Sequence, residues 1–266
     1  MNFVVIGGGP TGVEMAGAIA EISRTTLLGS FRRITPENAK VYLIEGLPHV
    51  LPSYSQRLSS RAKKDLEHLG VEVINSRRVT DLSEEGVSLD DDFIACKNII
   101  WAAGNQGSEL LKTLDCPLDK QGRAYVKPDL TLEGHSEIFV IGDTAHTPGL
   151  DGNPLPGIAT VAIQQGRYVA GLIKKGYQQE KRPPFIFFDK GSMATIGKGK
   201  AIAKVGKLEF TGHLAWLMWG VIHIAYLIGF RTKLGVLVEW IIVFFTGQRG
   251  VRIITEGIEK ELPSKD

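Results

Sequence analysis

Short apolar runs and amphipathic stretches alternate along the first hundred residues. Residues 3–6, 41–44, 71–74 and 98–101 are almost wholly apolar, which is typical of strands buried on both faces of a parallel sheet. Residues 11 to about 28 and 55–69 have helical spacing, and Gly70 is a typical C-terminal cap for the second of these helices. This alternation predicts a doubly wound α/β unit, with a hairpin at 87–89 and 93–95 inserted before its last strand.

The pattern changes twice in the second half of the chain. Residues 124–126 and 138–141 are strand-like, 160–174 are helical, and Pro183-Pro184 marks a boundary. From about Asp189 the chain becomes more apolar. Residues 214–230 contain no formal charge, and 234–245 form a second apolar stretch that includes Glu239.

A glycine fingerprint joins the first predicted strand to the first predicted helix. Gly7 permits a tight turn, Gly9 lets the backbone approach a pyrophosphate, and Gly12 lets the helix pack closely on the strand. The N-terminus of the helix offers unpaired N–H groups and the positive end of its dipole to phosphates. In this setting the motif predicts nucleotide binding, whereas a glycine turn with a purely structural role is the alternative.

Glu45 ends the second predicted strand, where a carboxylate accepts hydrogen bonds from ribose hydroxyls and repels a 2′-phosphate. It therefore favours NADH over NADPH. It lies 33 residues after Gly12, which is longer than the usual spacing of about 20 residues, so residues 24–38 are interpreted as an insertion.

Composition narrows the class without naming a function. The 266 residues carry a net charge of +2, which does not indicate nucleic-acid binding. Cys96 and Cys116 form no C-x-x-C motif, so no redox dithiol is predicted and two reduced thiols are expected. We assign no metal site, and we interpret His223, within an apolar stretch, as an interface histidine rather than a ligand.

Five segments of the sequence, taken in order, carry a family resemblance. They are Gly7-Gly8-Gly9-Pro10-Thr11-Gly12-Val13-Glu14, Trp101-Ala102-Ala103-Gly104, Ile141-Gly142-Asp143-Thr144-Ala145, Ala162-Ile163-Gln164-Gln165-Gly166 and the Asp-Lys-Gly-Ser-Met-Ala-Thr-Ile-Gly segment at 189–197. In this order they resemble type II NADH dehydrogenase. The resemblance covers nearly the whole chain, and its more specific parts are the last two segments and the hydrophobic C-terminus.

The resemblance implies a partial Rossmann-like α/β fold of the two-dinucleotide-binding flavoprotein type, followed by a helical membrane anchor. Residues 1–104 would form the NADH-binding domain. Residues 105–188 would be the returning half of the FAD-binding domain, and 189–266 the membrane-anchoring region. Trp101 is expected to pack at the crossover between the two nucleotide domains.

The resemblance also assigns roles to individual side chains. Glu14 would position the nicotinamide and flavin rings and relay protons; a dipole-favoured acid is the alternative. Asp143 would bind a ribityl hydroxyl of FAD, rather than being an ordinary turn aspartate. Gly104 and Ala162 would lie at the cofactor.

Two further side chains would act at the quinone. Gln165 would orient a quinone carbonyl rather than face solvent, although Thr160 stands where many members have a glutamine. Lys190 would stabilise a reduced, anionic flavin or quinol oxygen, with a surface lysine as the alternative.

The resemblance implies an FAD-dependent NADH:quinone oxidoreductase that does not pump protons. The family's first glycine fingerprint, which holds the FAD pyrophosphate, has no counterpart here. A missing N-terminal FAD-binding segment is therefore expected. The alternative function is a flavin-free fragment that binds NADH and membrane without turnover.

The C-terminal apolar block predicts how the protein meets its membrane-borne substrate. Residues 214–230 would span roughly 26 Å as a helix, less than the roughly 30 Å of a bilayer core. Trp216, Trp219, Tyr226 and Trp240 suit an interface, as Arg231, Lys233, Arg249 and Arg252 suit lipid headgroups. We expect a monotopic protein, a homodimer on the cytoplasmic face of the inner or plasma membrane. A hydrophobic dimer interface in a soluble protein is the alternative.

Overall fold

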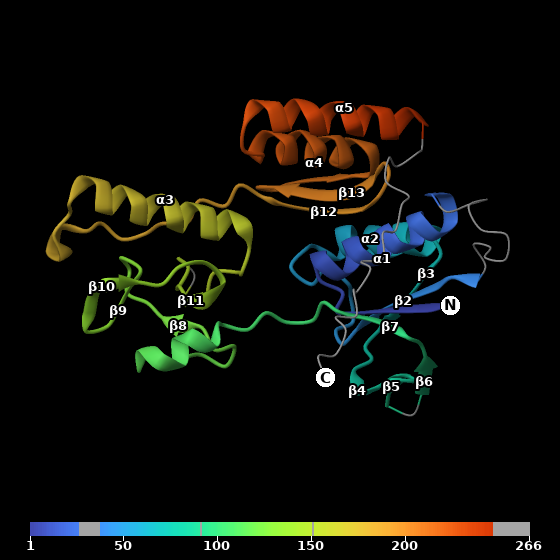
Figure 1. The fold of residues 1–266 in the computed structure, drawn as a ribbon, viewed down its shortest axis with the longest axis horizontal. Coiled ribbons are helices and arrows are strands. Elements are labelled where there is room, and N and C mark those ends of the chain that lie inside the picture. Colours follow the sequence, from blue (N-terminus) through green and yellow to red (C-terminus); the bar gives the residue numbers. More distant parts are fainter. Residues whose placement is uncertain (27–37, 91, 151, 247–266) are drawn as a thin grey trace, which may run out of the picture.

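A parallel sheet forms the centre of the N-terminal half of the computed structural model, which describes residues 1–26, 38–90, 92–150 and 152–246. Its strand order is β3-β2-β1-β7, and every neighbouring pair is parallel, as in one half of a doubly wound fold (Figure 1). The predicted α/β unit is confirmed. Its elements are β1 (Asn2–Ile6), α1 (Pro10–Glu21), β2 (Lys40–Glu45), α2 (Gln56–His68), β3 (Val71–Asn75) and β7 (Asn98–Trp101).

The two faces of this sheet bury alternate residues of each strand, because successive side chains point to opposite faces. Val5 and Leu43 pack beneath α1 and α2. Val4, Ile6 and Ile44 pack on the other face, against the small antiparallel sheet that contains the predicted hairpin. That sheet consists of β4 (Val79–Ser83), β5 (Gly86–Leu89) and β6 (Asp92–Ala95).

Helix boundaries follow the caps in the sequence more closely than the apolar periodicity. Ser55 caps α2 by accepting a hydrogen bond from the Leu58 N–H at 3.3 Å, and Gly70 adopts φ +81° after the helix. The first predicted helix is too long, because α1 ends at Glu21 and a π-helical turn, Ile22–Thr26, follows it. The predicted insertion at 24–38 lies mostly outside the described residues.

A second, smaller unit consists of short strands and turns with one long helix, α3, along one side of them (Figure 1). Its buried residues, including Leu111, Ala124, Leu132 and Val140, form a core separate from that of the parallel sheet. The predicted strand at 138–141 ends early, because the backbone turns at Ile141 into a short 3-10 helix, Gly142–Thr144. The elements are a 3-10 helix (Glu109–Leu114), β8 (Ala124–Tyr125), β9 (Thr131–Leu132), β10 (His135–Phe139), β11 (Ala145–His146), α3 (Ala159–Lys175) and a 3-10 turn (Gln179–Lys181).

A third sheet, which the sequence analysis did not predict, covers the outer face of α1. It is antiparallel and consists of β12 (Ser192–Gly197), β13 (Lys200–Val205) and β14 (Leu208–Thr211). A Cβ added to Gly17 would lie 1.9 Å from the Ile196 carbonyl oxygen, so α1 and β12 are in backbone contact. Ala194, Ile196 and Ile202 consequently belong to the same core as the parallel sheet.

Two apolar helices, α4 (Gly212–Tyr226) and α5 (Phe230–Thr246), form a hairpin on this third sheet (Figure 1). The apolar stretch 214–230 is therefore not one helix: it breaks at Leu227, and Gly229 has φ +82°. Trp219 and Trp240 stack in parallel across the hairpin, with ring centroids 5.3 Å apart. Among the described residues, no helix has both the length and the apolarity needed to cross a membrane. Arg249 and Arg252 lie outside the described residues.

Candidate functional site

The three fingerprint glycines occupy the positions that their predicted roles require. Gly7 has φ +106°, and a Cβ there would lie 2.8 Å from the backbone of Ala102. A Cβ on Gly12 would lie 1.8 Å from the Gly7 carbonyl oxygen, whereas one on Gly9 would meet no described atom within 4 Å. The loop is therefore closely packed at its first and third glycines and open at its second, next to the N-terminus of α1. This is the shape of a cradle for a dinucleotide pyrophosphate.

Glu45 lies at the carboxyl end of β2, beside this loop. Its Oε2 atom accepts a hydrogen bond from the Gly8 N–H at 2.6 Å, and its Oε1 atom accepts one from the Leu47 N–H at 2.7 Å. Each carboxylate oxygen retains a second lone pair. The carboxylate is thus fixed in position at the edge where a ribose would lie.

Glu14 is half-buried on α1, two residues after Gly12. The Thr195 N–H of β12 lies 3.3 Å from its Oε1 atom and donates to it. Burial raises the pKa of the Glu14 carboxyl, and the hydrogen bond from Thr195 and the charge of His223 both act to lower that pKa. A carboxyl group with a raised pKa can hold and release a proton closer to neutral pH.

The sequence analysis missed the residues that surround Glu14. Tyr54 is buried near Glu14, and its side chain is hydrogen-bonded to that of Ser192. Burial raises the pKa of the Tyr54 phenol; the bond to Ser192 lowers it, and the charge of Glu14 raises it further. Thr195 and Ser192 both lie in the Asp-Lys-Gly-Ser-Met-Ala-Thr-Ile-Gly segment, so the motif marked the region but not its contact with α1.

A second group of predicted residues lies on the smaller unit. Asp143 is exposed in the turn after β10, and the Asn105 amide is at 3.5 Å, the outer limit for a hydrogen bond. Gly142, with φ +69°, lies against the Ala162 methyl group of α3. Gly104 is also exposed, with φ +77°. Small residues therefore leave the Asp143 carboxylate open to a ligand.

Trp101 does not pack as expected within the described structure. Its side chain is 58% exposed, and its indole N–H donates to the Ala103 carbonyl oxygen at 2.7 Å. The predicted packing at a domain crossover is therefore not observed among the described residues.

Gln165 differs from both of its sequence interpretations, because it neither faces solvent nor has an accessible group for a quinone carbonyl. Its side chain is 1% exposed. Its Oε1 atom accepts from the Gly142 N–H at 2.6 Å, and its Nε2 atom donates to the Thr147 hydroxyl at 2.9 Å. Gln165 thus fixes the turn that presents Asp143.

Lys190 lies directly before β12 and reaches α4. Its Nζ atom donates to the Tyr226 hydroxyl at 3.1 Å and lies 5.8 Å from the centroid of the Tyr226 ring. Lys190 therefore links the segment that contains Ser192 and Thr195 to the C-terminal end of α4, and its ammonium group remains exposed.

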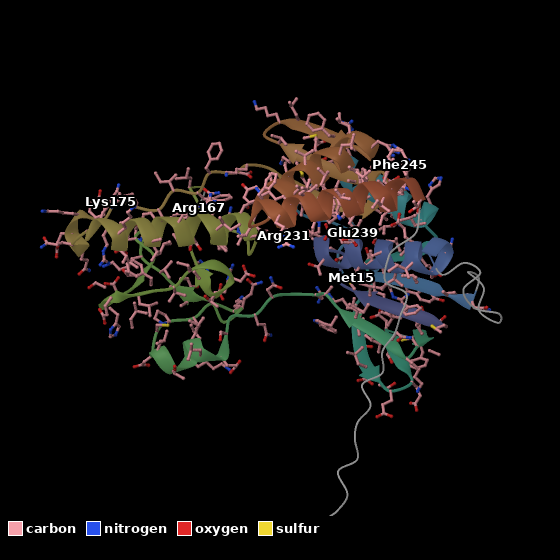
Figure 2. All side chains as sticks on the ribbon, turned by 45° about the horizontal axis from the view of Figure 1, so that its top comes forward. Met15, Arg167, Lys175, Arg231, Glu239 and Phe245 are labelled. Carbon is pink, nitrogen blue, oxygen red and sulfur yellow. The ribbon has the colours of Figure 1, made fainter. Side chains whose placement is uncertain are left out.

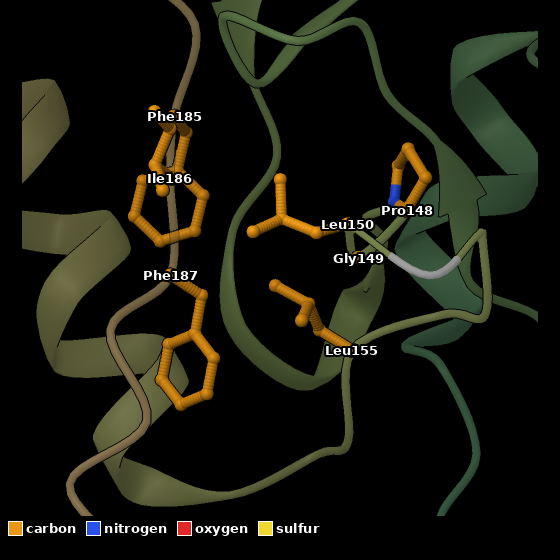
Figure 3. A pocket seen from close by; sticks show the side chains of 7 residues that line it. All are labelled: Pro148, Gly149, Leu150, Leu155, Phe185, Ile186 and Phe187. Carbon is orange, nitrogen blue, oxygen red and sulfur yellow. The ribbon is translucent and has the colours of Figure 1, made fainter.

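An apolar pocket of about 220 Å³ lies between the segment that follows Asp143 and the extended segment 185–187 that leads to Lys190 (Figure 3). Leu150 and Leu155 face Phe185 and Phe187 across it. The lining residues carry no titratable side chain, so the pocket offers contact surface rather than catalytic groups. They are Pro148, Gly149, Leu150, Leu155, Phe185, Ile186 and Phe187.

Comparison with protein families assigns the class. Residues 1–166 match the model of the pyridine nucleotide-disulphide oxidoreductase family, and the chain belongs to this family. Residues 190–249 match a second model, the NDH2 C-terminal domain, which covers β12–β14 and the α4–α5 hairpin.

Curated relatives narrow the class further. The chain is 43% identical to the type II NADH:quinone oxidoreductase Ndh of Mycobacterium tuberculosis, over 96% of this chain and 57% of that protein. It is 28% identical to the mitochondrial internal alternative NAD(P)H-ubiquinone oxidoreductase A1 of Arabidopsis thaliana, over 95% of this chain and 53% of that protein. The chain thus spans a little over half the length of these relatives.

A solved structure has the same fold. NDH2 from Plasmodium falciparum, in complex with NADH, superposes with a TM-score of 0.82 at 19% identity. The match covers 94% of this chain and 67% of that one, so it includes the third sheet and the α4–α5 hairpin.

Proposed function

We propose that this chain supplies the NADH site, part of the FAD site and the membrane-facing surface of an NADH:quinone oxidoreductase of type II. The observation that carries the proposal is the cradle formed by the open Gly9, the closely packed Gly12 and the fixed Glu45 carboxylate. The family membership and the names of the curated relatives support the same activity.

NADH fits the cradle through groups already in place. The backbone at Gly7, Gly9 and Gly12 and the N-terminus of α1 would bind the pyrophosphate. Glu45 would accept hydrogen bonds from the adenosine ribose hydroxyls and disfavour a 2′-phosphate.

FAD fits the second group of residues. The exposed Asp143 carboxylate would accept a hydrogen bond from the ribityl chain, and Gly104, Gly142 and Ala162 leave room for close approach. When bound, FAD supplies a two-electron carrier between NADH and quinone. Gln165 acts through the protein, since it holds Gly142 and so sets the direction of the Asp143 turn.

Two side chains contribute charge and protons. Glu14 would orient the rings beside α1 and hold a proton on its carboxyl group, because burial favours the protonated form. Lys190 would place a positive charge where negative charge develops on a reduced quinone, with Tyr226 positioning its ammonium group.

The α4–α5 hairpin is proposed as the membrane-binding surface. Ile228 and Phe230 at its turn are 92% and 80% exposed, and Phe245 near the far end is 81% exposed. Figure 2 shows Arg231 and Phe245 at opposite ends of α5. Arg231 and Lys233 lie beside the turn, where cations meet lipid phosphates. We propose further that the chain lies in one leaflet, on the cytoplasmic face of the inner or plasma membrane, as a homodimer and together with a further FAD-binding segment.

The anchor has its own test, flotation with liposomes. We expect the chain to float, and replacing Ile228 and Phe230 together by aspartate to leave it in the soluble fraction with unchanged thermal stability. Replacing the exposed Leu150, on the smaller unit, by aspartate is the control and should not affect flotation. A soluble wild-type chain would favour the dimer-interface alternative.

The activity is tested by the visible spectrum of the purified chain with and without added FAD. A flavin band that NADH bleaches and a quinone restores would establish the oxidoreductase. NADH binding without any flavin band would favour the alternative, a fragment that binds NADH and membrane without turnover.

A further inference from the structure

The segment that follows β3 is joined to the segment that follows β2, at the carboxyl edge of the parallel sheet. The two strands pair in parallel up to Glu45 and Asn75. Beyond them the Arg77 N–H donates to the Glu45 carbonyl oxygen at 3.2 Å, and the Ser76 N–H donates to the Leu47 carbonyl oxygen at 3.0 Å. The residues just after β3 therefore share one surface with Glu45, whose carboxylate is proposed to bind ribose.

Arg78 lies against Gly46, the residue directly after Glu45. A Cβ added to Gly46 would lie 3.4 Å from the Cγ atom of Arg78 and 3.7 Å from its Nε atom. The Nε atom belongs to the guanidinium group, so this group lies beside the backbone of residue 46. The contact brings a positive charge to the edge of the sheet where Glu45 ends β2.

Arg77 and Arg78 are adjacent in the sequence but differ in their partners. Arg77 donates from Nε to Asp90 at 2.8 Å and from Nη2 to Asp92 at 2.9 Å. Arg78 is exposed, and its side chain makes no hydrogen bond or ion pair with any residue that the structure describes. A guanidinium group stacks its flat face on aromatic rings, nucleobases among them. Arg78 is therefore available to a ligand, whereas Arg77 stabilises the fold.

The strand order gives the direction in which a dinucleotide would run. The glycine cradle for the pyrophosphate follows β1, the Glu45 carboxylate ends β2, and β2 lies between β1 and β3. A dinucleotide that leads from the cradle to Glu45 continues in the same direction toward the end of β3. The group beyond the adenosine ribose is adenine, so adenine reaches the segment that contains Arg78.

We propose that Arg78 recognises the adenine ring of NADH, with its guanidinium group stacked on one face of the ring. The inference deepens the proposed NADH site and rests on it. Glu45 and Arg78 bind two different parts of adenosine, the ribose hydroxyls and the base. Leu47, whose side chain is 46% exposed, adds apolar surface at the same edge. Because Arg78 lies at the adenine end of the dinucleotide, it contributes to affinity rather than to the chemical step.

A 2′-phosphate is the other group that an arginine binds at this edge in related folds. The Glu45 carboxylate argues against it here, because the N–H groups of Gly8 and Leu47 hold the carboxylate at 2.6 and 2.7 Å beside the place of the ribose. Adenine is uncharged, so stacking on Arg78 brings no negative group toward Glu45.

Isothermal calorimetry with the full chain separates the two halves of the dinucleotide. The ligands are NADH, ADP-ribose, which contains the adenine, and reduced nicotinamide mononucleotide, which lacks it. Arg78→Ala should weaken the binding of NADH and of ADP-ribose by the same factor, about fivefold or more, and leave the binding of the mononucleotide unchanged. Lys40→Ala is the control: it removes one exposed positive charge from the opposite, amino-terminal end of β2 and should change none of the three affinities.

A second variant separates stacking from charge. Arg78→Lys keeps the charge but loses the flat guanidinium face, so it should bind ADP-ribose almost as weakly as Arg78→Ala. Full ADP-ribose affinity in either variant would overturn the proposal. A loss of NADPH affinity with unchanged NADH affinity in Arg78→Ala would also overturn it, in favour of a 2′-phosphate contact.

The outcome for the wild-type chain distinguishes this proposal from the proposed function. If the chain shows the expected binding pattern but no turnover with FAD and quinone, the role of Arg78 is supported and the proposed oxidoreductase activity fails. If the wild-type chain binds neither NADH nor ADP-ribose, the NADH site and the role of Arg78 are both refuted.

Discussion

Replacing Gln165 by leucine separates the structural role of this residue from a role in quinone binding. The side chain is fully buried, and both of its hydrogen-bonding groups have protein partners, Gly142 and Thr147. Leucine has a similar volume, so the substitution removes the hydrogen bonds without opening a large cavity.

The expected loss of stability follows from the groups left behind. A buried backbone N–H without a partner costs about 1–3 kcal/mol, and an ordinary hydrogen bond contributes about 0.5–1.5 kcal/mol. Gln165→Leu should therefore lower the free energy of unfolding by roughly 2–4 kcal/mol. FAD affinity should fall as well, because the Asp143 turn loses the contact that directs it.

Denaturant unfolding followed by circular dichroism measures the first effect, and flavin fluorescence titration measures the second. Thr147→Val is the matched control: it removes one of the two hydrogen bonds and leaves Gly142 paired. It should cost about 1–3 kcal/mol, because the buried Gln165 amide N–H is left without a partner. If Gln165→Leu kept full stability and FAD affinity but raised the KM for quinone, the structural role would be refuted and the quinone contact supported.

Five further substitutions test other parts of the structure. Glu45→Ala should weaken NADH binding by about tenfold or more, equivalent to about 1.4 kcal/mol, in isothermal calorimetry; unchanged affinity would remove Glu45 from the ribose site. Gly9→Ala should fold normally and lose NADH affinity, because its Cβ would enter the open space proposed for the pyrophosphate. Gly12→Ala should also lose stability, because its Cβ would collide with the Gly7 carbonyl oxygen. Equal melting temperatures for the two variants would contradict this. Glu14→Gln should stabilise the protein at pH 7 more than at pH 4, since an acid with a raised pKa destabilises the fold progressively as pH rises above its unfolded value of 4.5; denaturation at both pH values decides. Burial raises the pKa of the Asp119 carboxyl, but hydrogen bonds from His146, Arg123 and backbone N–H groups outweigh it and hold that pKa well below its usual range. Asp119→Asn should therefore lower the free energy of unfolding by about 3–5 kcal/mol at neutral pH. This loss should become smaller as the pH falls below about 4, where the carboxyl is protonated in the unfolded chain.

The parts of the fold that rest on local chemistry were predicted correctly. Buried strands such as β1 and β2 are short apolar runs, and Ser55 and Gly70 mark the two ends of α2. The glycine fingerprint also has a geometry that its residue types predict, because Gly7 adopts a positive φ, Gly12 packs against the Gly7 carbonyl of the same loop, and Gly9 remains open.

The parts that rest on contacts between distant segments were missed. Residues 192–197 contain both polar and apolar positions, and their burial depends on α1, which lies far away in the sequence. The environment of Glu14 has the same origin, since the Thr195 N–H, the Tyr54 phenol and the charge of His223 act on it from three distant segments of the chain. Gln165 was misread because a glutamine on a helix gives no local sign of a buried partner such as Gly142.

Because Gly17 of α1 and Ile196 of β12 are in backbone contact, the N-terminal parallel-sheet unit and the β12–β14 sheet form one cooperative folding unit. Because α1 is covered by its own sheet on one side and by β12 on the other, residues 1–104 alone would expose the apolar surface now covered by Ala194, Ile196 and Ile202. The nucleotide domain should therefore not be separable by proteolysis or by gene truncation, and native-state hydrogen exchange should show α1 and β12 opening together. A disturbance of the α4–α5 hairpin would reach α1, the helix at the proposed dinucleotide site, through a single intervening layer of structure, the β12–β14 sheet.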